Sequence, residues 1–63
     1  MEELMIKAIR QFKREHRDCQ IRNVHCWEYS TKRGVIDYAL FNIEYVDKDG
    51  DYEEVNISTT NWI

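Results

Sequence analysis

A chain of 63 residues, 43% hydrophobic and 33% charged, provides for one domain, residues 1–63, and leaves no material for a second. It has no apolar run near the roughly 20 residues of a membrane-spanning helix, and its start, Met-Glu-Glu, lacks the basic and apolar regions of a signal peptide. We therefore expect a cytoplasmic protein in which Cys19 and Cys26 are thiols rather than a disulfide.

Charge is distributed unevenly along the chain, whose formal net charge is −3. Residues 1–33 hold eight Lys or Arg against five Asp or Glu, whereas residues 34–63 hold one Lys against seven acids. This division into a basic and an acidic half bears on the choice of partners and not on the fold.

The segment from Glu2 to about Arg17 is predicted to form a helix, because residues with high helix propensity dominate it. Glu2 and Glu3 lie at the positive end of the helix dipole, where acidic side chains are stabilising. One stripe of this helix is apolar at helical spacing: Leu4, Met5, Ala8, Ile9 and Phe12. The opposite face is basic: Lys7, Arg10, Lys13, Arg14 and Arg17.

The segment from Ile21 to about Ser30 is predicted to be the first strand, followed by a hairpin loop at Thr31–Gly34 in which Gly34 supplies a positive φ. Strict alternation along a strand divides its side chains between two faces. One face then carries Ile21, Asn23, His25, Trp27 and Tyr29. The other face carries Arg22, Val24, Cys26 and Glu28.

The run Val35–Val46 is the longest apolar and aromatic stretch and is predicted to be the central strand. A second loop follows at Asp47–Asp51, where Asp-Gly is a strong hairpin signal. The last strand is predicted from Tyr52 to about Thr60. Two hairpins in succession give an α+β fold, in which the N-terminal helix packs on a three-stranded antiparallel meander (αβββ).

One helix covers only one face of this sheet. The pattern alone does not fix which face the helix covers, but Ala39, Phe41 and Ile43 with Val55 and Ile57 form the better core, because Ala39 leaves room for a helix to approach. The uncovered apolar face would then be a protein interface, and self-association as a symmetric dimer is the commonest use of such a surface. The expected interface joins this face to the acidic hairpin: Tyr38, Leu40, Tyr52, Trp62, Asp49 and Asp51.

Three other features of the sequence bear on function. The basic helix face predicts phosphate contacts and so offers nucleic-acid binding as the alternative function. The histidines and cysteines lie within eleven positions, but the spacing of His16, Cys19 and His25 is not that of a standard zinc site, and no metal or other cofactor is expected. The acidic loop lacks the Gly and Glu positions of an EF-hand, which favours a solvated hairpin tip.

Catalytic motifs are missing from the sequence: there is no glycine-rich phosphate loop and no Ser-His-Asp arrangement. We therefore expect a non-catalytic binding or regulatory module that acts by protein–protein interaction. Compact acidic chains of this kind are typical of inhibitors and adaptors encoded on phages and mobile elements.

Overall fold

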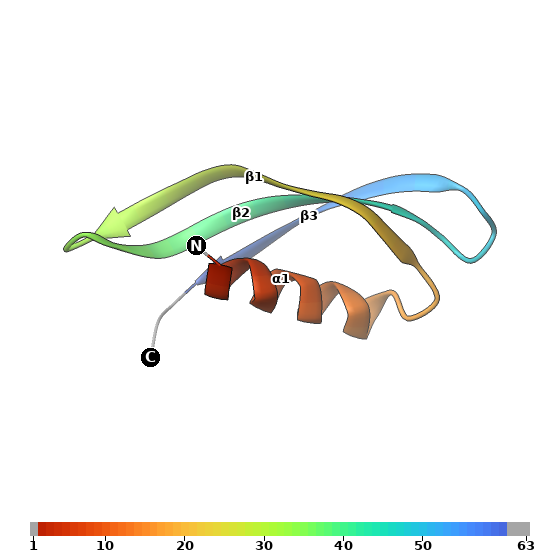
Figure 1. Cartoon of the computed structure of the whole chain (residues 1–63), viewed down its shortest axis with the longest axis horizontal. Helices are drawn as coiled ribbons and strands as arrows, with labels where there is room; N and C mark the ends of the chain where they lie inside the picture. Colours follow the sequence, from red (N-terminus) through yellow and green to blue (C-terminus); the bar gives the residue numbers. More distant parts are fainter. Residues whose placement is uncertain (1, 61–63) are drawn as a thin grey trace.

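The computed structural model describes residues 2–60 and consists of one helix lying against one face of a three-stranded sheet (Figure 1). The elements follow the chain in the order α1 (Glu2–Glu15), β1 (Gln20–Lys32), β2 (Val35–Val46) and β3 (Tyr52–Thr60). The sheet has the order β1-β2-β3, and both pairings are antiparallel. The predicted αβββ architecture, with Val35–Val46 as the middle strand, is confirmed.

Helix α1 packs against β2 and β3. Leu4, Ala8 and Phe12, spaced four residues apart, are fully buried, as the apolar stripe predicted. The Thr59 hydroxyl donates a 3.2 Å hydrogen bond to the Leu4 carbonyl, which ties β3 to the start of α1. The helix ends at Glu15, two residues earlier than predicted.

The helix-facing side of the sheet supplies the rest of the core. Ala39, Phe41 and Ile43 alternate along β2 and are fully buried, and Ile57 lies opposite Phe41 on β3. The helix therefore covers the face that formed the better core of the two that the sequence left open. Ala39 lacks bulk, which allows the helix to approach closely.

Strand β1 does not alternate regularly, because its pairing with β2 shifts between Ile21 and Asn23 and between Cys26 and Glu28, each time with one extra residue on β1. A third shift, between Ser30 and Thr31, leaves the extra residue on β2. Each extra residue in a bulge exchanges the faces of the residues that follow it. Val24 lies opposite Ile43 and Ile21 lies opposite Tyr45, so both residues are on the helix side of the sheet.

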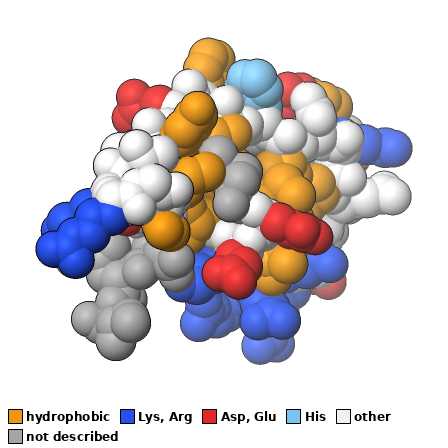
Figure 2. Space-filling view, turned by 60° about the vertical axis from the view of Figure 1, so that its left-hand side comes forward, with side chains coloured by type: hydrophobic (Ala, Val, Ile, Leu, Met, Phe, Trp, Pro, Cys, Tyr) orange, Lys and Arg blue, Asp and Glu red, His pale blue; other side chains and the backbone are white. Residues whose placement is uncertain are grey.

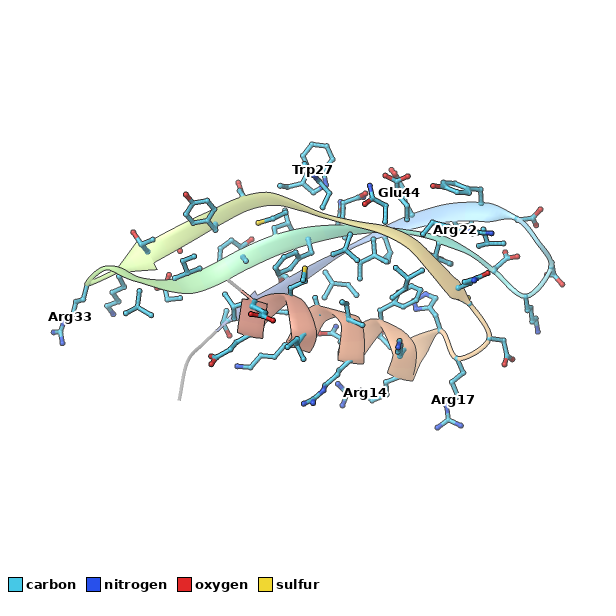
Figure 3. The ribbon with its side chains drawn as sticks, viewed as in Figure 1. Arg14, Arg17, Arg22, Trp27, Arg33 and Glu44 are labelled. Carbon is cyan, nitrogen blue, oxygen red and sulfur yellow. The ribbon has the colours of Figure 1, made fainter. Side chains whose placement is uncertain are left out.

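The predicted division of the first strand into two faces is thus wrong. Ile21 lies on the helix side, whereas His25 pairs with Asn42 on the other side. Trp27 also points away from the helix (Figure 3). The strand is longer than predicted at both ends, since pairing continues into the loop region as far as Lys32.

The first hairpin turns on two residues, Arg33 and Gly34, with φ values of 55° and 80°. Positive φ at both central residues defines the type I′ turn, whose twist matches that of paired strands. β3 reaches only as far as the pair of Tyr38 with Thr60, so Val35 pairs with β1 alone among the described residues. The β1–β2 hairpin consequently projects past α1 and gives the molecule a length of 44 Å (Figure 1).

Candidate binding surfaces

The side of the sheet that faces away from α1 is called here the outer face. In the described part of the chain no element covers it (Figure 1). Its central row, from β2, mixes partly buried apolar residues with polar ones: Tyr38, Leu40, Asn42, Glu44 and Val46. The outer face is therefore less apolar than the face that packs against α1.

Two hydrogen bonds link β2 to β3 across the outer face. Asn42, which is buried, donates from Nδ2 to Asn56 Oδ1 over 3.0 Å. The Tyr52 hydroxyl donates to Glu44 Oε2 over 2.8 Å. The hydrogen bond to Glu44 is the main cause that raises the pKa of Tyr52, because it stabilises the protonated phenol.

Trp27 is the most prominent apolar side chain on the outer face, with 61% of its surface exposed (Figure 3). It lies in the irregular part of β1, between Cys26 and Glu28. The His25 ring packs edge-on against it, with 5.3 Å between the ring centroids. Trp27 was not predicted as a site residue, because the sequence pattern placed it on the same face as His25 but did not show that this face points away from the helix.

The structure brings part of the predicted interface together. Tyr38, Leu40 and Tyr52 share the outer face, the first two half-buried and the third 61% exposed. Asp49 and Asp51 are exposed at the β2–β3 turn, at one end of the sheet. Trp62 lies outside the described residues.

The β2–β3 turn is organised by Asp47. Its Oδ1 accepts hydrogen bonds of 2.9 Å from the backbone N–H groups of Asp49 and Asp51. The Asp47 backbone also bonds to Gly50 and Asp51, and Gly50 has a φ of 86°. The Asp47 carboxylate thus closes the turn, whereas the Asp49 and Asp51 side chains are exposed to solvent, as predicted for a hairpin tip.

The five basic residues predicted to share one helix face do not all border one site. Lys7, Arg10 and Arg14 line an open hollow of about 380 Å³ between α1 and the end of β3, with Gln11 and the segment 58–60. Lys7 Nζ donates a 3.2 Å hydrogen bond to the Thr60 carbonyl there. Arg17 lies further along the chain, and Arg14 and Arg17 both project away from the sheet (Figure 3).

Figure 2 shows the molecule turned so that the side of the β1–β2 hairpin comes forward. Several Lys and Arg side chains lie along the lower edge of this view and others at its left and right edges, with hydrophobic side chains between them (Figure 2). The hydroxyl-bearing residues of β3 that border the basic hollow, Ser58, Thr59 and Thr60, were not predicted as site residues. No sequence motif marks them, because only the packing of α1 on β3 brings them to the cations.

A second hollow, of about 250 Å³, lies where α1 meets the β2–β3 turn and includes His16, Arg17, Cys19, Asp47 and Asp49 in its lining. The His16 ring stacks on the Phe12 ring, with 4.6 Å between the ring centroids. Phe12 in turn packs edge-on against Tyr45. Burial, followed by the nearby acidic groups of Cys19 and Glu53, raises the pKa of Tyr45.

Potential metal ligands are dispersed. His25 lies on the outer face, whereas His16 contacts Tyr45 on the helix side of the sheet. Residues 2–60 contain no group of three or more His, Cys, Asp or Glu side chains placed to hold a metal ion.

Comparison of the chain with protein-family models, with curated proteins and with solved structures found no match. Over the part of the chain that the structure describes, no helix is long and apolar enough to cross a membrane.

Proposed function

We propose that this protein is a small non-catalytic binding module of the cytoplasm, an inhibitor or adaptor that engages another protein through the outer face of its sheet. The observation that carries the proposal is the exposure of Trp27 and Tyr52 beside half-buried Tyr38 and Leu40 on a face that no described element covers. Trp and Tyr are the residue types that most often dominate binding energy at protein interfaces.

The two exposed aromatic side chains have contacts of their own. His25 packs against Trp27, and Glu44 accepts the hydrogen bond of the Tyr52 hydroxyl. Binding costs less when the contacting side chains already hold one conformation, because less rotamer freedom is lost. Trp27 and Tyr52 are therefore suited to act as anchors in partner pockets, with the polar residues around them as the rim.

The acidic hairpin tip adds charge to this surface. Asp49 and Asp51 are exposed, and the hydrogen bonds to Asp47 fix the backbone that presents them. Carboxylates at the end of a rigid sheet favour a partner with a basic surface and accelerate its association. A protein that normally binds nucleic acid has such a surface.

The test is an affinity capture from a lysate of the source cells, performed with and without nuclease. We compare the natural protein with a Trp27→Ser/Leu40→Ser variant and with the control Ile6→Ser, which changes an exposed apolar residue on α1. A partner captured by the natural protein and the control but lost with the double variant supports the proposal. A partner retained by the double variant, with its fold intact by circular dichroism, contradicts it.

Nucleic-acid binding is the second candidate, favoured by the basic hollow. Lys7, Arg10 and Arg14 converge there with hydroxyl-bearing residues of β3, and cations and hydroxyls are the groups that contact phosphates. Changing both Arg10 and Arg14 to Glu should weaken the binding of a labelled duplex and flatten its salt dependence. Lys48→Glu is the control, because Lys48 lies in the β2–β3 turn; equal effects of the control and the double variant would count against this site.

A further inference from the structure

The two edges of the sheet differ. β3 pairs with β2 through nine consecutive residues without a register shift, whereas β1 carries an extra residue at two places, Arg22 and Trp27. Bulges prevent an edge strand from pairing with another chain, and so do prolines. β3 has neither, so it is the regular edge at which a further strand can be added.

Opposite charges lie at the two ends of β3. Its first residues include Glu53 and Glu54, both exposed. Its last residues, 58–60, border the hollow lined by Lys7, Arg10 and Arg14. The Thr60 carbonyl accepts a hydrogen bond from Lys7, so the end of the strand is in direct contact with one of these cations.

When β3 of a second copy pairs antiparallel with β3, the acidic end of each strand lies beside the basic end of the other. Pairing two copies around a two-fold axis at Asn56 sets residue 53 of each copy opposite residue 59 of the other, and residue 55 opposite residue 57. Glu53 lies opposite Tyr45 and hence on the helix side of the sheet, the side on which the basic hollow opens. Each Glu53 carboxylate would then enter the basic hollow of the other copy.

The same register also continues the core. Val55 is half-buried on the helix side of the sheet, next to buried Ile57. In the pairing around Asn56, Val55 of each copy meets Ile57 of the other, so apolar surface is removed from water at the centre of the contact. The charges stand at its two ends, where they fix the register.

We propose that the protein forms a symmetric dimer by antiparallel pairing of β3 with β3 of a second copy, with Glu53 of each copy in the basic hollow of the other. The three-stranded sheets then join into one of six strands. This contact uses the edge of the sheet and not its outer face. The dimer is therefore compatible with binding of another protein at the outer face, and does not require it.

The test is a charge exchange, measured as native mass by sedimentation over a range of protein concentrations. The natural protein should reach twice 7.7 kDa. Arg10→Glu places acidic side chains together at each end of the contact, and Glu53→Arg places cations together. Each variant alone should weaken dimerisation by about tenfold or more.

An equimolar mixture of the two variants is the decisive sample. At one end of the mixed dimer the two substituted positions, 53 of one chain and 10 of the other, carry opposite charges again. At the other end, natural Glu53 faces natural Arg10, so both ends are complementary and the mixture should dimerise better than either variant alone. Lys13→Glu is the matched control, because Lys13 carries the same charge on the exposed side of α1 but does not line the hollow.

Several outcomes would overturn the proposal. These are a natural protein that stays monomeric, an Arg10→Glu variant that behaves as Lys13→Glu does, and a mixture no more dimeric than its components. A dimer that resists both charge reversals but dissociates on Leu40→Ser would assign self-association to the outer face instead. Circular dichroism of each variant shows whether the monomer fold is intact, so that unfolding is not mistaken for dissociation.

Discussion

Tyr52 and Glu44 are joined diagonally across β3 and β2 by a 2.8 Å hydrogen bond from the phenol to the carboxylate. This hydrogen bond, burial and the negative charges of Glu44 and Glu54 raise the pKa of Tyr52, whereas nearby Arg22 lowers it. Replacing Glu44 by Gln should therefore bring the pKa of Tyr52 down toward its usual value of about 10. The difference between tyrosinate absorbance titrations of each protein and of its Tyr52→Phe version isolates this residue; Glu54→Gln is the control and should have the smaller effect.

The raised pKa of Tyr52 also predicts how stability depends on pH. A group that binds its proton more tightly when folded stabilises the fold fully below its unfolded pKa, near about 10, and loses that contribution as the pH rises through its folded pKa. We expect the free energy of unfolding to fall less in this alkaline range for Tyr52→Phe than for the natural protein. Parallel curves for the two proteins would contradict the assignment.

Phe12 should be among the most costly residues of α1 to truncate. Its ring is fully buried and contacts both His16 and Tyr45. Phe12→Ala should reduce the free energy of unfolding by about 3–5 kcal/mol, because it removes apolar contacts and leaves a cavity. Ile6→Ala, on the same helix but 41% exposed, should change it by about 0.5 kcal/mol or less. Urea denaturation of both variants measures the difference.

Two aspartates of the β2–β3 turn have different roles: Asp47 stabilises the turn, whereas Asp49 is available for binding. Asp47→Ala removes two hydrogen bonds to backbone N–H groups and should destabilise the fold by about 1–3 kcal/mol. Asp49→Ala should leave stability almost unchanged, since the Asp49 side chain is exposed and none of the hydrogen bonds found in residues 2–60 uses its carboxylate. Thermal denaturation of the two variants tests this; equal losses would show that Asp47 has no special role.

Arg33 adopts a left-handed backbone conformation that is unfavourable for most side chains. Asn tolerates this conformation better, and Asn-Gly is the preferred pair in a type I′ turn. Arg33→Asn should therefore raise the melting temperature, by an amount that corresponds to about 0.5–1 kcal/mol. Arg33→Val is the opposing variant and should lower it, because β-branched residues are disfavoured at positive φ.

Much of this fold could be predicted from local patterns. The apolar stripe of α1 and the turn signals around β2 defined the elements, because helical spacing and loop chemistry depend on neighbouring residues alone. The pattern favoured one of the two sheet faces as the buried one but did not fix it. The bulges of β1 could not be predicted in this way. They depend on which residue of β2 lies opposite, so the placement of Ile21 and His25 on opposite sides became evident only from the register.

The candidate sites also differ in how far local patterns could predict them. Tyr38, Leu40 and Tyr52 share a face because β2 and β3 pair without a shift, which simple alternation describes correctly. The hollow between α1 and β3 depends instead on how the helix lies across the sheet. Its β3 members, Ser58 among them, have no distinguishing feature in the sequence.

The irregularity of β1 limits how far assembly can proceed. If two copies join through β3, the only edges left on the shared sheet, over the described residues, are two β1 strands, each interrupted by two bulges. A third copy would meet a strand whose N–H and C=O groups are out of step with its own. Growth by addition of strands would therefore stop at two chains, and a small protein with an open sheet would be protected from forming fibres.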